Sequence, residues 1–146
     1  MRDEWTVGAE FNAPDVEVDG SELAAYRLAR MSARLVQHLP PGAGFDPTSV
    51  WHTLAAWAPI DFVIGRALTA LGQAPQLRGL GFDVRAIRGV QAFVALETSC
   101  TLGTAVRVLH SEPARDGSVE ASLDVTLSYK RGLVARFSVD LRLRAA

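Results

Sequence analysis

The stretch from Trp51 to Gly72, WHTLAAWAPIDFVIGRALTALG, is the most apolar part of the sequence and constrains the fold more than any other. A segment of about 20 residues is nearly long enough to cross a bilayer. Its histidine (His52), aspartate (Asp61), arginine (Arg66) and central Pro59 argue against a membrane span, because charges at membrane depth are costly. A helix that is apolar nearly all round is more simply explained by burial in a soluble core. We therefore predict a buried central helix that the rest of the chain surrounds.

The composition is that of one ordinary domain, and we expect residues 1–146 to form it. The 146 residues are 49% hydrophobic with a formal net charge of −1, which gives no reason to expect nucleic acid or a membrane as a partner. Cys100 is the single cysteine, so an internal disulfide framework is excluded and a reducing cytoplasm is favoured. The first residues lack the apolar run of a signal peptide, so we expect a cytoplasmic location.

The first third of the sequence predicts a short extended segment followed by a surface helix. Residues 5–18 alternate apolar and polar positions until Pro14 interrupts them. Asp19 and Glu22 have the spacing of a helix N-cap and its partner, and residues 22–39 form an amphipathic pattern that ends before Pro40. In the central stretch, Pro59 indicates either a kink or the start of a second helix.

After Leu80 the hydrophobic period changes from 3.6 to 2, which predicts strands. The last two expected strands alternate most cleanly, with Val119 to Tyr129 and Leu133 to Leu143 each placing every second residue on one apolar face. Asp116-Gly117 and Lys130-Arg131-Gly132 are typical hairpin turns. The expected strands are Phe82–Ile87, Val90–Leu96, Thr104–His110, Ser118–Tyr129 and Leu133–Leu143.

An antiparallel sheet with one polar, solvent-exposed face and one apolar face needs another element to bury the apolar face. The central helix is the only element apolar enough to do so, and we therefore predict an α+β fold in which a curved antiparallel sheet wraps a long central helix. This is the hotdog arrangement. The cone-shaped α+β barrel of ketosteroid-isomerase-like proteins is an alternative with the same order of helices and strands.

Three segments resemble MaoC-like hydratases and dehydratases. TVGAEFNAPDVEVDGSELAAYRLA is similar to the family's opening strands and first helix, GFDPTSVWHTLAAW to the loop that carries a histidine, and residues 101–144 to the last strands. The resemblance implies a hotdog dimer acting on an acyl-CoA or acyl-carrier-protein thioester, with no bound cofactor or metal. The family's Asp-x-Asn-x-x-His pattern ends here at His38, and its other two positions hold Ala33 and Leu35.

The sequence also resembles PaaI-type acyl-CoA thioesterases, another hotdog family. These proteins carry His-Gly-Gly at the start of the central helix and a catalytic acid nine residues after the histidine. His52 and Asp61 have that spacing here, whereas Thr53 and Leu54 replace the two glycines.

Asp61, His52 and His38 are the candidate catalytic residues. A carboxylate can serve as acid, base or nucleophile toward a thioester, and free N–H groups at a helix start can polarise its carbonyl. Nine helical residues separate His52 from Asp61, so the two side chains would meet only across a dimer interface. A purely structural alternative is that Asp61 complements the helix dipole or pairs with Arg66.

Trp51, Thr53 and Trp57 are the candidate substrate-binding residues, and Trp51, next to His52, is placed to line an acyl tunnel. The structural alternative is that Trp51 and Trp57 pack in the core. Arg27, Arg30 and Arg34 form a stripe that is either a solvated helix face or a contact for phosphates or a carrier protein. The sequence therefore predicts a dehydratase or hydratase, with two alternatives left open. One is an acyl thioesterase, and the other is a non-catalytic hotdog subunit that binds an acyl intermediate or a partner in fatty acid or polyketide metabolism.

Overall fold

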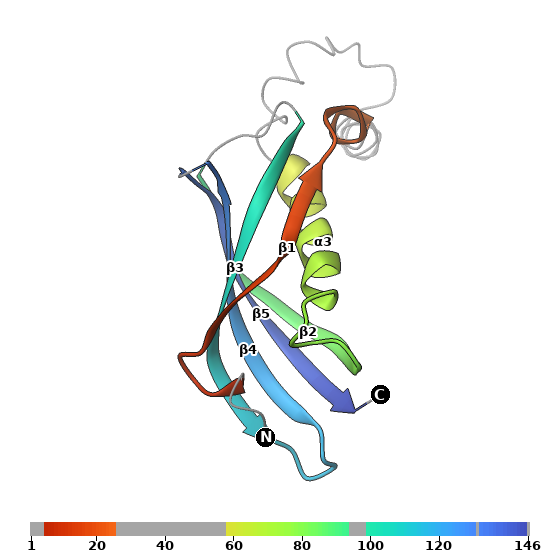
Figure 1. Cartoon of the computed structure of the whole chain (residues 1–146), viewed down its shortest axis with the longest axis vertical. Coiled ribbons are helices and arrows are strands. Elements are labelled where there is room, and N and C mark those ends of the chain that lie inside the picture. The colour runs from red at the N-terminus through yellow and green to blue at the C-terminus, as the bar shows by residue number, and fades with distance from the viewer. Residues whose placement is uncertain (1–4, 26–57, 94–98, 131, 146) are drawn as a thin grey trace, which may run out of the picture.

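The protein folds as one antiparallel sheet with a helix lying along one of its faces (Figure 1). This computed structural model describes residues 5–25, 58–93, 99–130 and 132–145, and for residues 58–61 it describes the backbone only. No helix among these residues is long and apolar enough to cross a membrane. The helix, α3, spans Ala58–Gly72, and residues 20–25 begin another helical segment.

The five strands are connected mostly by short turns. They are β1 (Glu10–Val18), β2 (Leu80–Ala92), β3 (Cys100–Pro113), β4 (Val119–Tyr129) and β5 (Gly132–Ala145). The predicted turns are confirmed: Gly117 has φ +85° between β3 and β4, and Lys130 has φ 55° between β4 and β5. Positive φ matches the handedness of tight hairpin turns.

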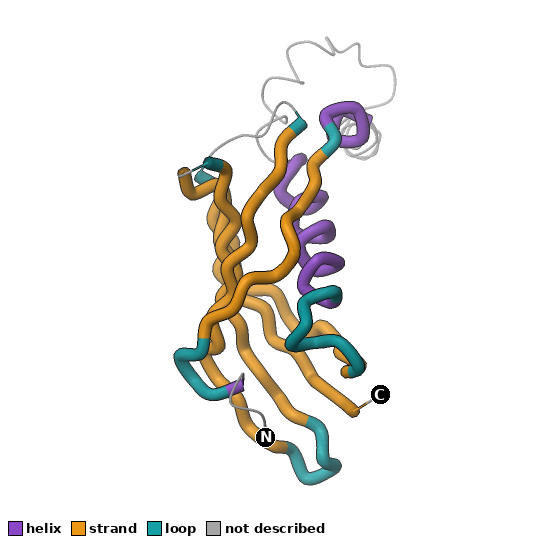
Figure 2. The backbone as a smooth tube through the Cα atoms, viewed as in Figure 1, coloured by secondary structure: helices purple, strands orange, loops and turns teal. Residues whose placement is uncertain are grey.

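The order of strands in the sheet is β1-β3-β4-β5-β2, with every neighbouring pair antiparallel. The sheet is strongly twisted, and α3 lies along the face that we call the inner face, beside β1 (Figure 2). β1 and β2 are the two edges. Ion pairs connect neighbouring strands: Arg136 of β5 pairs with Asp124 of β4, and Arg144 of β5 pairs with Asp83 of β2.

The core fills the space between α3 and the inner face of the sheet. The predicted alternation of β4 is confirmed, with Ala121, Leu123, Val125 and Leu127 all at most 3% exposed. β5 contributes Ala135, Phe137, Val139, Leu141 and Leu143 to the same face. α3 covers them with Val63, Ile64, Ala67, Ala70 and Leu71.

The expectation that the central helix is buried all round is wrong for the part that the structure describes. Gly65, Arg66 and Thr69 are exposed, and they lie on the side of α3 away from its buried residues. The physical reason is that one sheet of a single chain covers only one side of the helix. Residues 51–57, the predicted first part of this helix, lie outside the described residues.

Two strand predictions are corrected by irregularities in the sheet. Phe82–Ile87 and Val90–Leu96 were expected as separate strands, but Leu80–Ala92 is one strand whose register shifts twice against β5. Residues 94–96 lie outside the described part. Leu133 was expected on the buried face and is 41% exposed, because the register between β4 and β5 shifts between Leu133 and Ala135. Such shifts move a residue from its expected face.

We predict that Phe137→Ala lowers the free energy of unfolding by about 3–5 kcal/mol, because it leaves a cavity in the middle of the inner face. Leu133→Ala is the matched control on the same strand, and it should change stability by no more than about 0.5 kcal/mol. Urea denaturation followed by circular dichroism measures both. Equal losses in the two variants would contradict the register described here.

Candidate functional site

Asp61, the principal candidate, lies in the first turn of α3. It is the fourth residue of a helix that runs from Ala58 to Gly72 and contains Pro59 in its first turn. Proline is well accommodated there, because the first helical N–H groups have no partner within the helix. The backbone of Asp61 is thus close to the free N–H groups and the positive end of the helix dipole.

The helix geometry determines which side of α3 carries Asp61. At about 100° per residue, Leu68 and Gly72 lie within about 20° of the direction of Asp61. A Cβ atom added to Gly72 would lie 2.8 Å from Cε1 of Phe82, so the last residue of α3 packs closely against a side chain of β2. Leu68 is only partly buried, which leaves the same side incompletely covered toward the start of the helix.

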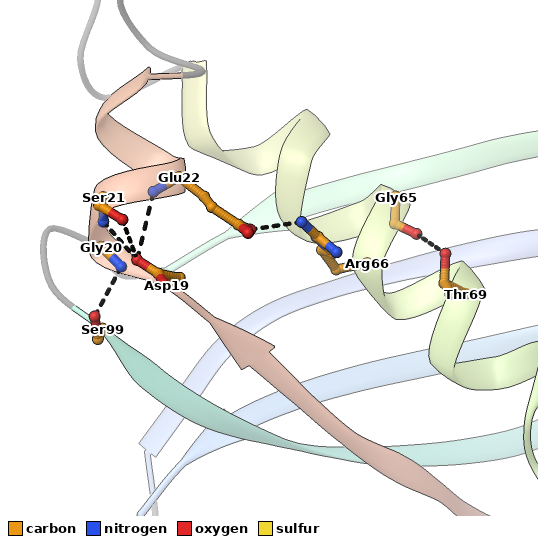
Figure 3. A network of polar contacts seen from close by, with 8 residues as sticks. All are labelled: Asp19, Gly20, Ser21, Glu22, Gly65, Arg66, Thr69 and Ser99. Atoms are coloured by element: carbon orange, nitrogen blue, oxygen red, sulfur yellow. Dashed lines mark hydrogen bonds and ion pairs between the residues drawn. The ribbon is translucent and has the colours of Figure 1, made fainter.

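Arg66 lies on the other side of α3, about 140° from Asp61. Its guanidinium forms an ion pair of 2.5 Å with the carboxylate of Glu22, and it also lies 5.1 Å from the ring centroid of Phe62 (Figure 3). The sequence left open whether Arg66 pairs with Asp61, and the structure gives Glu22 as a partner. Both side chains are about half exposed, so the pair contributes little to stability but fixes a contact between the two helical segments.

The predicted N-cap at Asp19 is confirmed, and it anchors Glu22. Oδ1 of Asp19 accepts hydrogen bonds from the backbone N–H and the hydroxyl of Ser21, at 2.8 and 2.6 Å, and a longer one from the N–H of Glu22. The backbone N–H of Gly20 donates to the hydroxyl of Ser99, just before β3 (Figure 3). The hydrogen bonds from Ser21 hold the pKa of the Asp19 carboxyl below its usual value.

Two further side chains near the start of β3 were not selected from the sequence as site residues. Thr104 is 4% exposed on the inner face, and its hydroxyl has no hydrogen-bond partner among the described residues. Cys100 is partly buried beside β1, and that burial raises the pKa of its thiol. A thiol with a raised pKa is a poor nucleophile, so Cys100 does not supply the chemistry.

The opposite, outer face of the sheet carries a polar groove of about 550 Å³. Its charged residues are Glu10, Arg107, Asp124 and Arg136. Asp124 is nearly buried because the guanidinium of Arg136 covers it, with Nε 3.0 and 3.2 Å from its two oxygens, and this pairing raises the pKa of Arg136. The groove lies on the far side of the sheet from α3, and it has no part in the chemistry predicted for Asp61.

Three solved structures have the same arrangement of sheet and helix. A MaoC-like dehydratase from Rhodospirillum rubrum superposes with a TM-score of 0.59 at 13% identity, over 97% of this chain and 94% of that one. The C-terminally truncated HadBC (3R-hydroxyacyl-ACP dehydratase) complex from Mycobacterium tuberculosis gives 0.60 at 17% identity, over 93% and 96%. A point mutant of the fluoroacetyl-CoA-specific thioesterase FlK with fluoroacetate and CoA gives 0.57 at 19% identity, over 99% and 96%.

The chain has the hotdog fold. No protein-family profile matches the sequence, and no curated protein matches it significantly. At identities below one fifth, the three likenesses establish the fold alone.

Most of the predicted site lies outside the described part of this hotdog chain. His38, Trp51, His52, Thr53 and Trp57 are in the range 26–57, and so is the arginine stripe. The structure therefore does not bring the candidates together or separate them. Within the described residues, no group of three or more histidine, cysteine, aspartate or glutamate side chains is arranged to hold a metal ion.

We predict that Asp19→Ala lowers the melting temperature of this hotdog at pH 7, and that the difference from wild type shrinks in acid. The folded pKa of Asp19 is depressed, so its contribution is complete above the unfolded value of about 3.9 and is lost as the pH falls through the folded pKa. Thermal melts at pH 7 and at decreasing pH below 4 measure this. Asp19→Asn, which keeps the cap but not the charge, should lose the pH dependence and retain most of the stability at pH 7.

Proposed function

We propose that this hotdog protein acts as a dimer on an acyl-CoA or acyl-carrier-protein thioester, as a 3-hydroxyacyl dehydratase or enoyl hydratase. The observation that carries the proposal is the position of Asp61 in the first turn of α3. A carboxylate at a helix start lies beside free N–H groups that can bind a thioester oxygen.

We also propose that residues 1–146 are a single cytoplasmic domain.

The proposed chemistry divides between the helix start and the candidate side chains. The N–H groups of the first turn of α3 polarise the thioester carbonyl and so acidify the α-carbon. One of Asp61 and His52 removes the α-proton, and the other donates a proton to the 3-hydroxyl, which leaves as water. Hydration is the same step reversed. His38 is an alternative acid or base. The side chains of Trp51, Thr53 and Trp57 line the pocket for the acyl chain of the substrate.

Two of the structural likenesses support this reaction, because their names describe dehydratases. One of them, HadBC, is a 3R-hydroxyacyl-ACP dehydratase solved as a complex, which also agrees with a site that more than one subunit completes. The sequence resemblance to MaoC-like proteins extends over most of the chain, in the same regions that form β1, β3, β4 and β5.

The two edges of the sheet support a dimer formed through β2. The β1 edge carries Pro14, exposed acidic residues and a register shift after Ala13, all of which discourage pairing with another strand. β2 has a free edge and exposes Val84, Ile87 and Val90, each at least 40% accessible. We infer that a second copy pairs along this edge and brings residues of its own to the proposed site.

A thioesterase is the second candidate, and one observation favours it. The fluoroacetyl-CoA-specific thioesterase FlK covers 99% of this chain at a TM-score of 0.57. In this alternative Asp61 activates water or attacks the thioester carbonyl, and the thiol leaves. The third possibility is a hotdog subunit that binds an acyl intermediate without catalysis.

We predict that 3-hydroxyacyl and enoyl thioesters are interconverted by this protein, and that Asp61→Asn lowers kcat by about 10²–10⁴-fold without unfolding it. A panel of 3-hydroxyacyl, enoyl and saturated thioesters, followed by absorbance of the enoyl group and by thiol release, measures this. Asp15→Asn, on the exposed β1 edge, is the control. Thiol release alone identifies the thioesterase, inactivity across the panel indicates a binding subunit, and activity that survives Asp61→Asn rejects the assigned residue.

We predict that Ile87→Asp, alone or combined with Val84→Asp, converts the dimer to a monomer. The reason is that a charge would be buried in the interface that β2 forms. Light scattering after size exclusion measures the mass. Val7→Asp is the control, since Val7 is 61% exposed and precedes β1, far from β2 in the sheet. A wild-type protein with the mass of one chain would refute the dimer.

A further inference from the structure

A row of small side chains crosses the inner face of the sheet. The strand registers align Ala13 of β1 with Thr104 of β3, then Leu127 of β4, Ala135 of β5 and Ala92 of β2. Three of these five residues are alanine, and Leu127 is the only one with a large side chain. The row runs from the open β2 edge, where Ala92 is exposed, to β1.

The next row along the sheet aligns Phe11 of β1 with Val106, Val125 and Phe137 of the following strands. The two rows differ most in side-chain size on β1 and β5, where Ala13 lies beside Phe11 and Ala135 beside Phe137. Figure 1 shows that α3 begins near the end of the sheet where β1 ends and β3 starts. Thr104 is the fifth residue of β3, so it lies toward that end of the strand.

Thr104 is the polar member of this row. Its side chain is on the inner face between Leu102 and Val106, which are 0% and 2% exposed, and it is itself 4% exposed. Its hydroxyl oxygen is fully enclosed and has no hydrogen-bond partner. Valine has nearly the same shape and occupies the next two inner positions of β3, Val106 and Val108. A buried hydroxyl without a partner is unfavourable, so a core that needed only the shape would have valine at position 104 as well.

We propose that Thr104 is a substrate-contact residue whose hydroxyl donates a hydrogen bond to an oxygen carried on the acyl chain of the bound thioester. The small residues of the row leave space for the chain, and Thr104 recognises a 3-oxo or 3-hydroxy group on it. This inference rests on the proposed function. It adds a specificity determinant outside α3 and outside the histidines and tryptophans predicted from the sequence.

The experiment compares two unreactive thioethers, S-(3-oxobutyl)-CoA and S-butyl-CoA, which differ in one oxygen atom. Isothermal titration calorimetry gives the dissociation constant of each for the wild-type chain and for Thr104→Val. The wild type should bind the oxo compound about fivefold more tightly, as one neutral hydrogen bond provides. Thr104→Val should bind both equally, with a melting temperature no lower than that of the wild type. Thr104→Ser, which keeps the hydroxyl, should restore the preference.

Thr126→Val is the matched control, because Thr126 is a partly buried threonine on the outer face of β4. It should leave the preference unchanged. A preference that persists in Thr104→Val, or a wild type that binds both compounds equally, overturns the assignment of Thr104 and leaves the proposed function standing. A wild type that binds neither compound, on CoA or on a carrier protein, overturns the proposed function itself, and the role of Thr104 with it.

Discussion

The burial of one side of α3 against the inner face of the sheet is the interaction on which the rest of the structure depends. The sheet presents an apolar face because β4 and β5 alternate, and α3 supplies the only described helix long enough to cover it. The contact is one-sided, so α3 keeps an exposed side and two flanks with different surroundings. One flank meets Glu22 through Arg66, and the other meets β2 at Phe82.

The first flank also explains why the start of α3 is tied to the end of β1. Asp19 caps the helical segment that carries Glu22, and Ser99 accepts a hydrogen bond from Gly20 in front of β3. Three pieces of chain that are distant in the sequence therefore meet at the end of the sheet where α3 begins (Figure 3). Exposed polar contacts of this kind add little free energy individually. Their consequence is geometric, since they fix α3 at Arg66 relative to the helical segment that follows β1.

The sequence predicted most of the sheet, because a period of two needs only the order of apolar and polar residues. It could not predict register shifts, which depend on the partner strand: Leu133 moved off the buried face, and two expected strands merged into β2. Asp61 was found because a carboxylate inside an apolar run is conspicuous. Thr104 was missed for the opposite reason, since a threonine in an alternating strand is ordinary until the structure shows that its hydroxyl has no partner.

Buried polar groups on the two faces of the sheet differ in whether they have a hydrogen-bond partner. Asp124 on the outer face is nearly buried, yet Arg136 from the neighbouring strand satisfies both of its oxygens. A long side chain beside open solvent can always fold back over such a group. On the inner face, the registered neighbours of Thr104 are Ala13 and Leu127, and neither side chain can accept or donate a hydrogen bond. Within the described part of the chain, the Thr104 hydroxyl therefore lacks the kind of partner that Arg136 gives to Asp124.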